Sequence, residues 1–187
     1  VANQINLGVE SSQIAYYAFH AAHDAKMYKE MDKYYDLAIT FEQGAKHTEQ
    51  VRLMSYQEQG DTLTWATKVR EICLKDPAAN EDYIQILSAY YQKKNPEDMG
   101  KFADEILANN PDIYIANYAR AFVYFQAAKY DDALKYYKKC TEIKPDDYNS
   151  WYQCGLCKYR QAYDLNSTIS NIKNRTEAQK ALEKTKS

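Results

Sequence analysis

A regular spacing of prolines constrains the fold of this 187-residue chain more than any other feature of its sequence. Pro77, Pro111 and Pro145 lie 34 residues apart, and they are three of only four prolines in the chain. Each follows a stretch in which apolar residues recur at helical spacing, so each marks a turn after a helix. A fixed period of this length indicates an array of structural repeats.

Apolar periodicity predicts pairs of amphipathic helices on the same register. Only five glycines are present, which leaves little material for tight β turns and favours an all-α chain. Residues 1–11 are expected to be the remnant of a preceding helix that ends near Gly8. Residues 168–187 are expected to form a separate, polar terminal helix that covers the last hairpin. Between them we expect helical hairpins over the ranges 12–45, 46–79, 80–113, 114–147 and 148–165.

Residues at matching offsets in these ranges resemble the tetratricopeptide-repeat (TPR) family. The family pattern has Trp, Leu-Gly and Tyr in the first helix, then Ala, an aromatic residue and a closing Pro in the second. The resemblance extends over about residues 12–164, and it implies a right-handed α-solenoid of about five antiparallel helical hairpins. The residues that carry it most clearly are Ala121, Tyr124, Tyr130, Ala133, Tyr137, Pro145, Trp151 and Gly155.

Two arginines depart from the family pattern. Arg52 and Arg120 occupy a position where the family prefers Leu. We expect their aliphatic stems to cross the seam between helices and their charged heads to reach water. The alternative is that each arginine pairs with an acidic residue of the preceding hairpin. Trp65 and Trp151 are both expected in the core, and the four cysteines are expected to be buried as small apolar residues.

In the TPR family the first helices line a concave groove, so the resemblance implies that partners bind there. Groove positions recur at i, i+4 and i+7, which is one stripe of a helix. This stripe is polar in the first hairpins and aromatic in the last ones. The candidate partner-binding residues are Tyr16, His20, His23, Met54, Tyr91, Tyr118, Phe122, Phe125, Tyr152 and Tyr159, and the same stripe includes Gln50, Gln57, Ile84, Ser88 and Leu156.

This groove predicts a non-catalytic protein–protein interaction scaffold that binds a peptide or a helix. Acidic chaperone tails are not expected as partners, because the positions that need Asn for that capture hold residues such as His20, Met54 and Phe122. One alternative is a periplasmic or surface glycan-binding protein that stacks sugar rings on groove tyrosines. Another alternative is a structural array that homo-oligomerises through an unfinished N-terminal end.

The sequence contains no motif that indicates an enzyme or a zinc-binding protein. A glycine-rich phosphate loop, a nucleophile elbow and an HExxH motif are all missing, so no enzyme activity, catalytic residue or cofactor is expected. A zinc site is not expected either, because His47 is predicted near the start of its helix and His20 and His23 late in theirs, which is expected to place His47 too far from the other two to share a metal ion.

Charge and hydropathy exclude two further kinds of partner. The net charge of −2 gives no field that would recruit nucleic acid. The mean hydropathy is −0.72, and no apolar run is long enough to span a membrane. Because the chain starts at Val1, we expect a processed or truncated N-terminus, which leaves cytoplasmic and secreted or periplasmic locations open.

Overall fold

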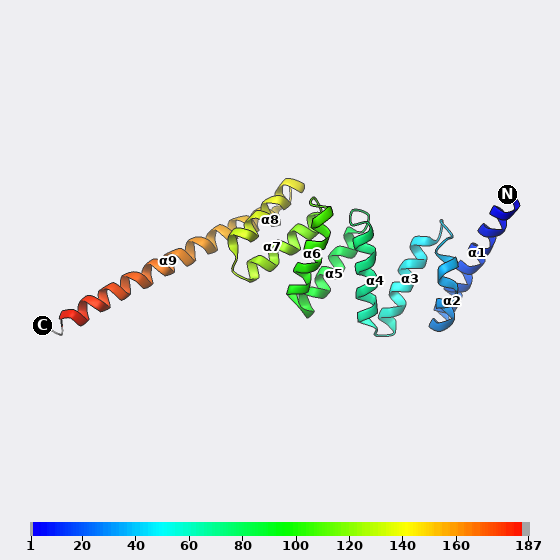
Figure 1. Ribbon diagram of the computed structural model, residues 1–187, viewed down its shortest axis with the longest axis horizontal. Coiled ribbons are helices and arrows are strands. Elements are labelled where there is room, and N and C mark those ends of the chain that lie inside the picture. The colour runs from blue at the N-terminus through cyan, green and yellow to red at the C-terminus, as the bar shows by residue number, and fades with distance from the viewer. Residues whose placement is uncertain (1, 185–187) are drawn as a thin grey trace. The chain divides into compact units, whose positions relative to one another are not determined.

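The computed structural model describes the backbone of residues 2–184 and the side chains of residues 10–177, 179 and 180. Within the described backbone, nine α-helices follow one another and no β-strand occurs (Figure 1). The all-α fold class predicted from the sequence is therefore confirmed.

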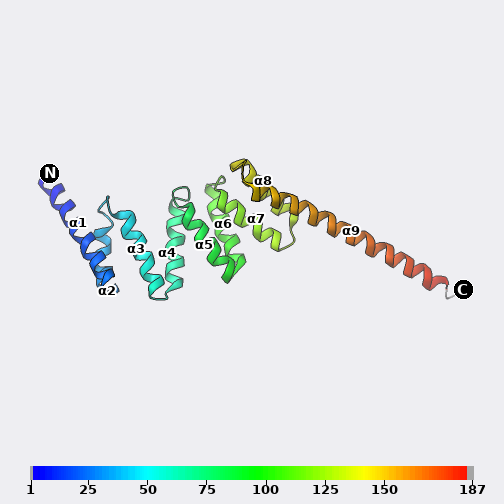
Figure 2. The same ribbon diagram turned by 180° about the vertical axis from the view of Figure 1, so that it is seen from behind.

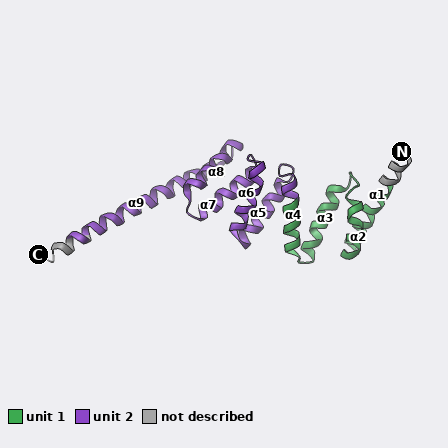
Figure 3. Cartoon of the chain, viewed as in Figure 1, with its two compact units in different colours: residues 1–71 green, residues 72–187 purple. Residues whose placement is uncertain are grey.

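The chain divides into two compact units, unit 1 with residues 1–71 and unit 2 with residues 72–187 (Figure 3). The division falls inside helix α4, Thr62–Lys75, and thus within one predicted hairpin rather than between two. Asp61 begins this helix, because its carboxylate accepts a hydrogen bond from the backbone N–H of Thr64 at 3.0 Å. Trp65 on α4 is buried, as predicted.

Unit 1 is built on helices α1 (Ala2–Asp24), α2 (Tyr28–Ala38) and α3 (Ala45–Glu58). Each of these three helices packs against the other two. Alanines face the seams and let the helices approach closely, while larger apolar residues fill the remaining space. The buried core consists of Ala15, Phe19, Ala22, Met31, Ala38 and Val51.

Unit 2 is a succession of helices in which each packs on the next. These helices are α5 (Glu81–Lys94), α6 (Pro96–Asn109), α7 (Tyr114–Gln126), α8 (Tyr130–Ile143) and α9 (Tyr148–Lys184). Helix α5 also contacts α7, so these two alternate helices lie side by side. This pattern is typical of a helical solenoid. One buried cluster in this unit consists of Ala121, Ala133, Leu134, Tyr137 and Cys157.

The turns inside three hairpins share one backbone conformation. Lys26, Gly60 and Ala128 have positive φ angles of 56°, 74° and 57°, and their positions differ by multiples of 34 residues. Each turn closes with a backbone hydrogen bond from the next residue to the residue five positions earlier, which defines a Schellman motif. These bonds join Met27 to Ala22 at 2.8 Å, Asp61 to Tyr56 at 2.8 Å and Lys129 to Tyr124 at 2.9 Å.

The hairpin of α5 and α6 makes its turn differently. Asn95 caps α6 by accepting a hydrogen bond from the backbone N–H of Glu97 at 3.1 Å. Pro96 follows as the first helical residue, where its missing N–H leaves no helical bond unmade. Both features agree with the repeat register.

Arg52 and Arg120 pair with acidic residues, so the prediction that their heads reach water is wrong. In unit 1, Arg52 lies 3.3 Å from Asp32 on α2, and in unit 2, Arg120 lies 2.8 Å from Asp104 on α6. Each arginine also donates a hydrogen bond of 2.9 Å to the tyrosine hydroxyl four residues later. A half-buried guanidinium needs several acceptors, and the acid and the phenol supply them.

Helix α1 runs without a break from Ala2 to Asp24, so the predicted end of a preceding helix near Gly8 is wrong. A glycine inside a helix costs only about 1 kcal/mol, so it does not by itself end the helix. Val1 lies outside the described residues.

Helix α9 is also continuous from Tyr148 to Lys184, so the prediction of a separate helix over 168–187 is wrong. Residues 185–187 of that prediction lie outside the described backbone. No Gly or Pro occurs between 156 and 184 to stop it. The predicted covering of the last hairpin does not occur either, because residues 162–177 are all exposed. In both views the second half of α9 extends past α8 (Figures 1 and 2).

Candidate partner-binding groove

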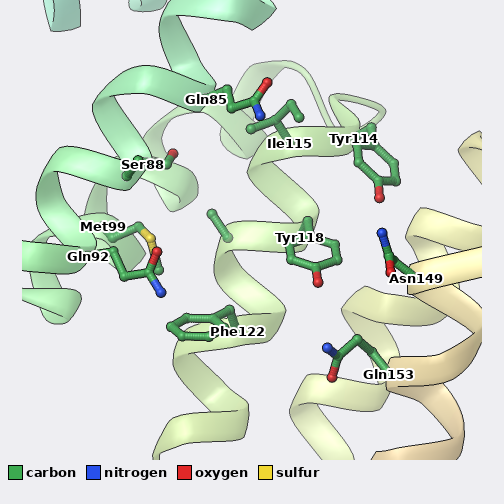
Figure 4. Close-up of a pocket in the computed structure, with 12 residues that line it drawn as sticks. Gln85, Ser88, Gln92, Met99, Tyr114, Ile115, Tyr118, Phe122, Asn149 and Gln153 are labelled. Carbon is green, nitrogen blue, oxygen red and sulfur yellow. The ribbon is translucent and has the colours of Figure 1, made fainter. Parts of the chain in front are cut away.

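Helices α5, α7 and α9 line a pocket of about 470 Å³ in unit 2 (Figure 4). They are the first helices of three successive predicted hairpins, and α6 contributes one further residue. A pocket of this size lies in the range of about 300–1,000 Å³ that is usual for binding sites. Its lining consists of Gln85, Ser88, Ala89, Gln92, Met99, Tyr114, Ile115, Tyr118, Ala119, Phe122, Asn149 and Gln153.

The floor of the pocket is apolar and comes mainly from α7. Tyr118 and Phe122 lie one helical turn apart, with Phe122 on the side of α5 and Tyr118 on the side of α9 (Figure 4). The ring of Tyr118 packs edge-on against the buried ring of Tyr137, with centroids 5.4 Å apart. This contact holds the Tyr118 ring in place in the floor.

The two walls of the pocket carry neutral polar side chains. Gln85, Ser88 and Gln92 form the α5 wall, whereas Asn149 and Gln153 form the α9 wall (Figure 4). None of the twelve lining residues carries a formal charge. Each primary amide offers both hydrogen-bond donors and an acceptor, so the walls can pair with a group that offers both in return.

Ser88 has a hydroxyl group without a partner. The residue is 8% exposed, and its Oγ makes no hydrogen bond with any described residue. A buried hydroxyl in this state costs about 1–3 kcal/mol. Because Ser88 lies in the wall of the pocket, a bound molecule can supply the missing hydrogen bond.

Hydrogen bonds hold the end of the pocket in place. The hydroxyl of Tyr114 donates to Asp147 Oδ2 at 2.8 Å and lies 3.3 Å from Ser150 Oγ. Asp147 Oδ2 also accepts the backbone N–H of Ser150 at 2.7 Å, at the start of α9. Burial raises the pKa of Tyr114 to about 12, so its phenol keeps its proton at neutral pH. The network joins α7 to α9, so the two helices position the floor and one wall together.

Tyr118 is likewise a neutral donor at neutral pH. Burial raises the pKa of Tyr118, although the nearby Gln153 side chain acts in the opposite direction.

Two of the ten candidate partner-binding residues, Tyr118 and Phe122, line the pocket, and so does Ser88 from the same stripe. Two other aromatic candidates contact rings of neighbouring helices instead. Tyr91 lies 5.8 Å from Phe102, and Phe125 lies 5.4 Å from Tyr130, between ring centroids. Tyr152 and Tyr159 are exposed and lie outside the lining.

Four amide residues of the walls were not predicted from the sequence, namely Gln85, Gln92, Asn149 and Gln153. Three of them directly follow a predicted groove residue, so the predicted stripe on α5 and α9 is rotated by one residue, or about 100°. The burial of Ile84 explains the shift on α5, because this apolar side chain is fully buried and cannot face a groove. The apolar Ile84 directly precedes the polar Gln85, and the expectation that the apolar residue of such a pair is buried was the sequence signal for this rotation.

The candidates in unit 1 form a different cluster. The rings of His20 and His47 stack with centroids 4.4 Å apart, and the hydroxyl of Tyr16 lies 3.0 Å from His47 Nδ1. The prediction that His47 lies far from His20 is therefore wrong, because α1 and α3 pack directly together. His23 lies 3.3 Å from Glu58, and Met54 is exposed.

The histidine pair does not extend to a metal site within the described residues. There, no group of three or more His, Cys, Asp or Glu side chains is arranged to hold a metal ion. The pKa of His20 is lowered by burial first and then by the neighbouring charge of His47, so its neutral form is favoured.

Trp151 is 57% exposed, so its predicted place in the core is wrong. Its indole N–H donates a hydrogen bond of 2.8 Å to the carbonyl of Pro145. Cys73, Cys140 and Cys157 are buried as predicted, and Cys154 is half-buried; all four are free thiols.

Comparison with known proteins supports the fold. No protein-family model matches the sequence, and a comparison with curated proteins finds no match. The crystal structure of MamA, a TPR-containing protein, matches with a TM-score of 0.52 and 15% sequence identity, over 88% of this chain and 89% of that chain. At this identity the similarity shows the fold alone.

The helical hairpins and this similarity define an all-α, TPR-like helical-repeat solenoid. In the part of the chain that the structure describes, no helix is both long and apolar enough to cross a membrane.

Proposed function

We propose that the protein is a non-catalytic interaction scaffold that binds an extended, uncharged peptide segment in the α5–α7–α9 pocket. The observation that carries this proposal is the unpartnered Ser88 hydroxyl in a wall that otherwise consists of amides. A free peptide backbone has the complementary groups, because each non-proline residue offers one N–H donor and one C=O acceptor.

The chemistry of the pocket also defines the preferred side chains. The rings of Tyr118 and Phe122 favour an apolar or proline side chain, which an extended or polyproline II segment presents without competing internal hydrogen bonds. The absence of charge in the lining disfavours acidic or basic peptides, because their charges would lose water without gaining a partner.

A peptide array tests this proposal, with the peptides varied in charge and in proline content. We expect binding of uncharged peptides with apolar or proline residues, measured afterwards in solution by calorimetry. Phe122→Ala should weaken this binding at least tenfold while the helical circular dichroism signal is retained.

Gln92→Ala and Gln57→Ala form a matched pair of variants for the walls. Gln92 lines the pocket, whereas Gln57 is an exposed glutamine of unit 1. Only the first substitution should weaken binding. If peptides bind Phe122→Ala or Gln92→Ala as tightly as the unchanged protein, the pocket is not the peptide site.

Glycan binding is a second candidate, and the exposure of Trp151 favours it. Indole and phenol rings can stack on sugar rings, and Trp151 has exposed Tyr148 and Tyr152 near it on α9. A glycan array decides between the two candidates: binding that Trp151→Ala abolishes and Phe122→Ala leaves intact would support glycans over peptides.

A further inference from the structure

Four tyrosines form an exposed stripe on α9, which we call the tyrosine stripe. Tyr148, Tyr152, Tyr159 and Tyr163 are 74%, 54%, 60% and 58% exposed. Their successive spacings of four, seven and four residues place them on one face of the helix. The rings lie in two pairs, Tyr148 with Tyr152 at 6.2 Å and Tyr159 with Tyr163 at 6.4 Å between centroids. Such a concentration of exposed rings marks an interaction surface.

The tyrosine stripe reads the same in both directions along the helix. Its midpoint lies between Gly155 and Leu156, because the spacing pattern is symmetric about that point. A second α9 that runs antiparallel would therefore place Tyr148 opposite Tyr163, and Tyr152 opposite Tyr159. A two-fold interface requires a surface patch that is complementary to itself in this way.

Gly155 at the centre of the stripe leaves room for a second helix. A Cβ atom built at this glycine would meet nothing within 4 Å, and the residue is exposed. The distance between two packed helices depends on the side chains at their crossing point, so a glycine there allows close approach. In the antiparallel arrangement this gap lies opposite the same gap of the second helix, because Gly155 of one copy is level with Leu156 of the other.

The charges beside the stripe favour the antiparallel orientation. Lys158 and Arg160 flank the stripe on its two sides and lie C-terminal to its midpoint. A parallel pair of helices would place Lys158 of one copy beside Arg160 of the other, which is unfavourable. In an antiparallel pair, Lys158 lies instead level with Gln153 of the second copy, on the flank that also carries the exposed Trp151, so the long lysine side chain can reach the indole ring.

We infer that the tyrosine stripe is a self-association surface, on which a second copy of this chain docks through its own α9 to form an antiparallel two-fold dimer. An aromatic residue buries about 150–250 Å² of surface when it is fully covered. At their exposed fractions, the four tyrosines therefore present on the order of 500 Å² of accessible surface per copy. Two copies together bury about 1,000 Å² from the rings alone, which approaches the roughly 1,200 Å² of small specific interfaces. This dimer uses the C-terminal helix, unlike association through the N-terminal end, and it is independent of the proposed peptide binding.

Sedimentation velocity over a hundredfold range of protein concentration tests the dimer. We expect the mass to rise toward twice the 21.8 kDa of one chain. Tyr152→Glu and Tyr159→Glu should each raise the dissociation constant at least tenfold. The control is Tyr17→Glu, because Tyr17 on α1 is 61% exposed and lies outside the stripe. A monomer at every concentration, or an equal effect of the Tyr17 variant, would overturn the inference.

Disulfide cross-linking tests the orientation, in a chain in which Cys154→Ser removes the half-buried thiol. Bridged residues need Cα atoms about 4.4–6.8 Å apart, so only residues that face each other across the seam can react. We expect Gly155→Cys to form a cross-linked dimer, and a mixture of Tyr148→Cys and Tyr163→Cys chains to form a mixed one. Efficient cross-linking of Tyr163→Cys with itself would mean a parallel pair and would contradict the antiparallel arrangement.

Discussion

Replacing Ser88 by alanine should make the free protein more stable and its peptide binding weaker. The hydroxyl is buried and has no hydrogen-bond partner among the described residues, so it destabilises the folded state. Removing such a group recovers part of the roughly 1–3 kcal/mol that it costs. Alanine also has a helix propensity about 0.5 kcal/mol more favourable than serine. We therefore expect the free energy of unfolding to rise by about 1–2 kcal/mol.

Thermal unfolding followed by circular dichroism measures the first half of this prediction. For a chain of this length, 1 kcal/mol corresponds to about 2–4 °C in Tm, so Ser88→Ala should raise Tm by about 2–8 °C. The second half follows from the lost hydrogen bond, which is worth about 0.5–1.5 kcal/mol and should raise the dissociation constant of a pocket-binding peptide about 2- to 12-fold.

Ser55→Ala is the matched control for both measurements. Ser55 is also a buried helical serine, but its hydroxyl donates a hydrogen bond of 2.7 Å to the carbonyl of Arg52. Its removal should give no comparable increase in Tm and no change in peptide affinity, since it lies outside the pocket. A decrease in the Tm of Ser88→Ala would show that the hydroxyl already has a partner in the free protein and would refute the reasoning.

Three further predictions follow from the turns, the histidine pair and the pocket lining. Ala128→Gly should stabilise the protein by about 0.5–1 kcal/mol, because glycine adopts a positive φ without strain. Gly60→Ala should destabilise it by about 1 kcal/mol for the same reason. Denaturant titration measures the free energy of unfolding of both variants. Burial and His47 lower the pKa of His20 below 6.5, so near this pH the unfolded chain binds more protons than the folded chain. Unit 1 should therefore lose stability as the pH falls through about 6.5, and hydrogen exchange measures this loss. The loss should be smaller in His20→Gln. Peptide affinity should stay within about twofold between low and high salt, because no lining residue is charged; a steep salt dependence in calorimetry would contradict a neutral site.

The repeat register predicted the helices well because its signals are local. Prolines, glycines and capping residues act on the backbone within a few residues, and Asn95 with Pro96 starts α6 as the register requires. The ends of the chain were predicted less well. The polar sequence of residues 168–187 predicted a separate helix, but a polar sequence without Gly or Pro continues an existing helix at little cost.

The errors in the site arise from tertiary packing. The partners of Arg52 and Arg120 lie on preceding helices, and sequence spacing does not show which side chains meet across a seam. The stacking of His20 with His47 depends in the same way on the packing of α1 against α3. On α7 the predicted stripe faces the pocket, but on α5 and α9 the helices are rotated by one residue, so amides replace predicted rings in the walls.

The unbroken helix α9 also keeps Lys184 at a fixed distance from the pocket. From Gln153 in the pocket wall to Lys184 the helix spans about 45 Å at 1.5 Å per residue. A flexible linker of the same length would have a root-mean-square span of about 30 Å and would sample short separations as well. A molecule attached beyond Lys184 is therefore held away from the pocket, and its effective concentration at a peptide bound there is far lower than a flexible tether would give.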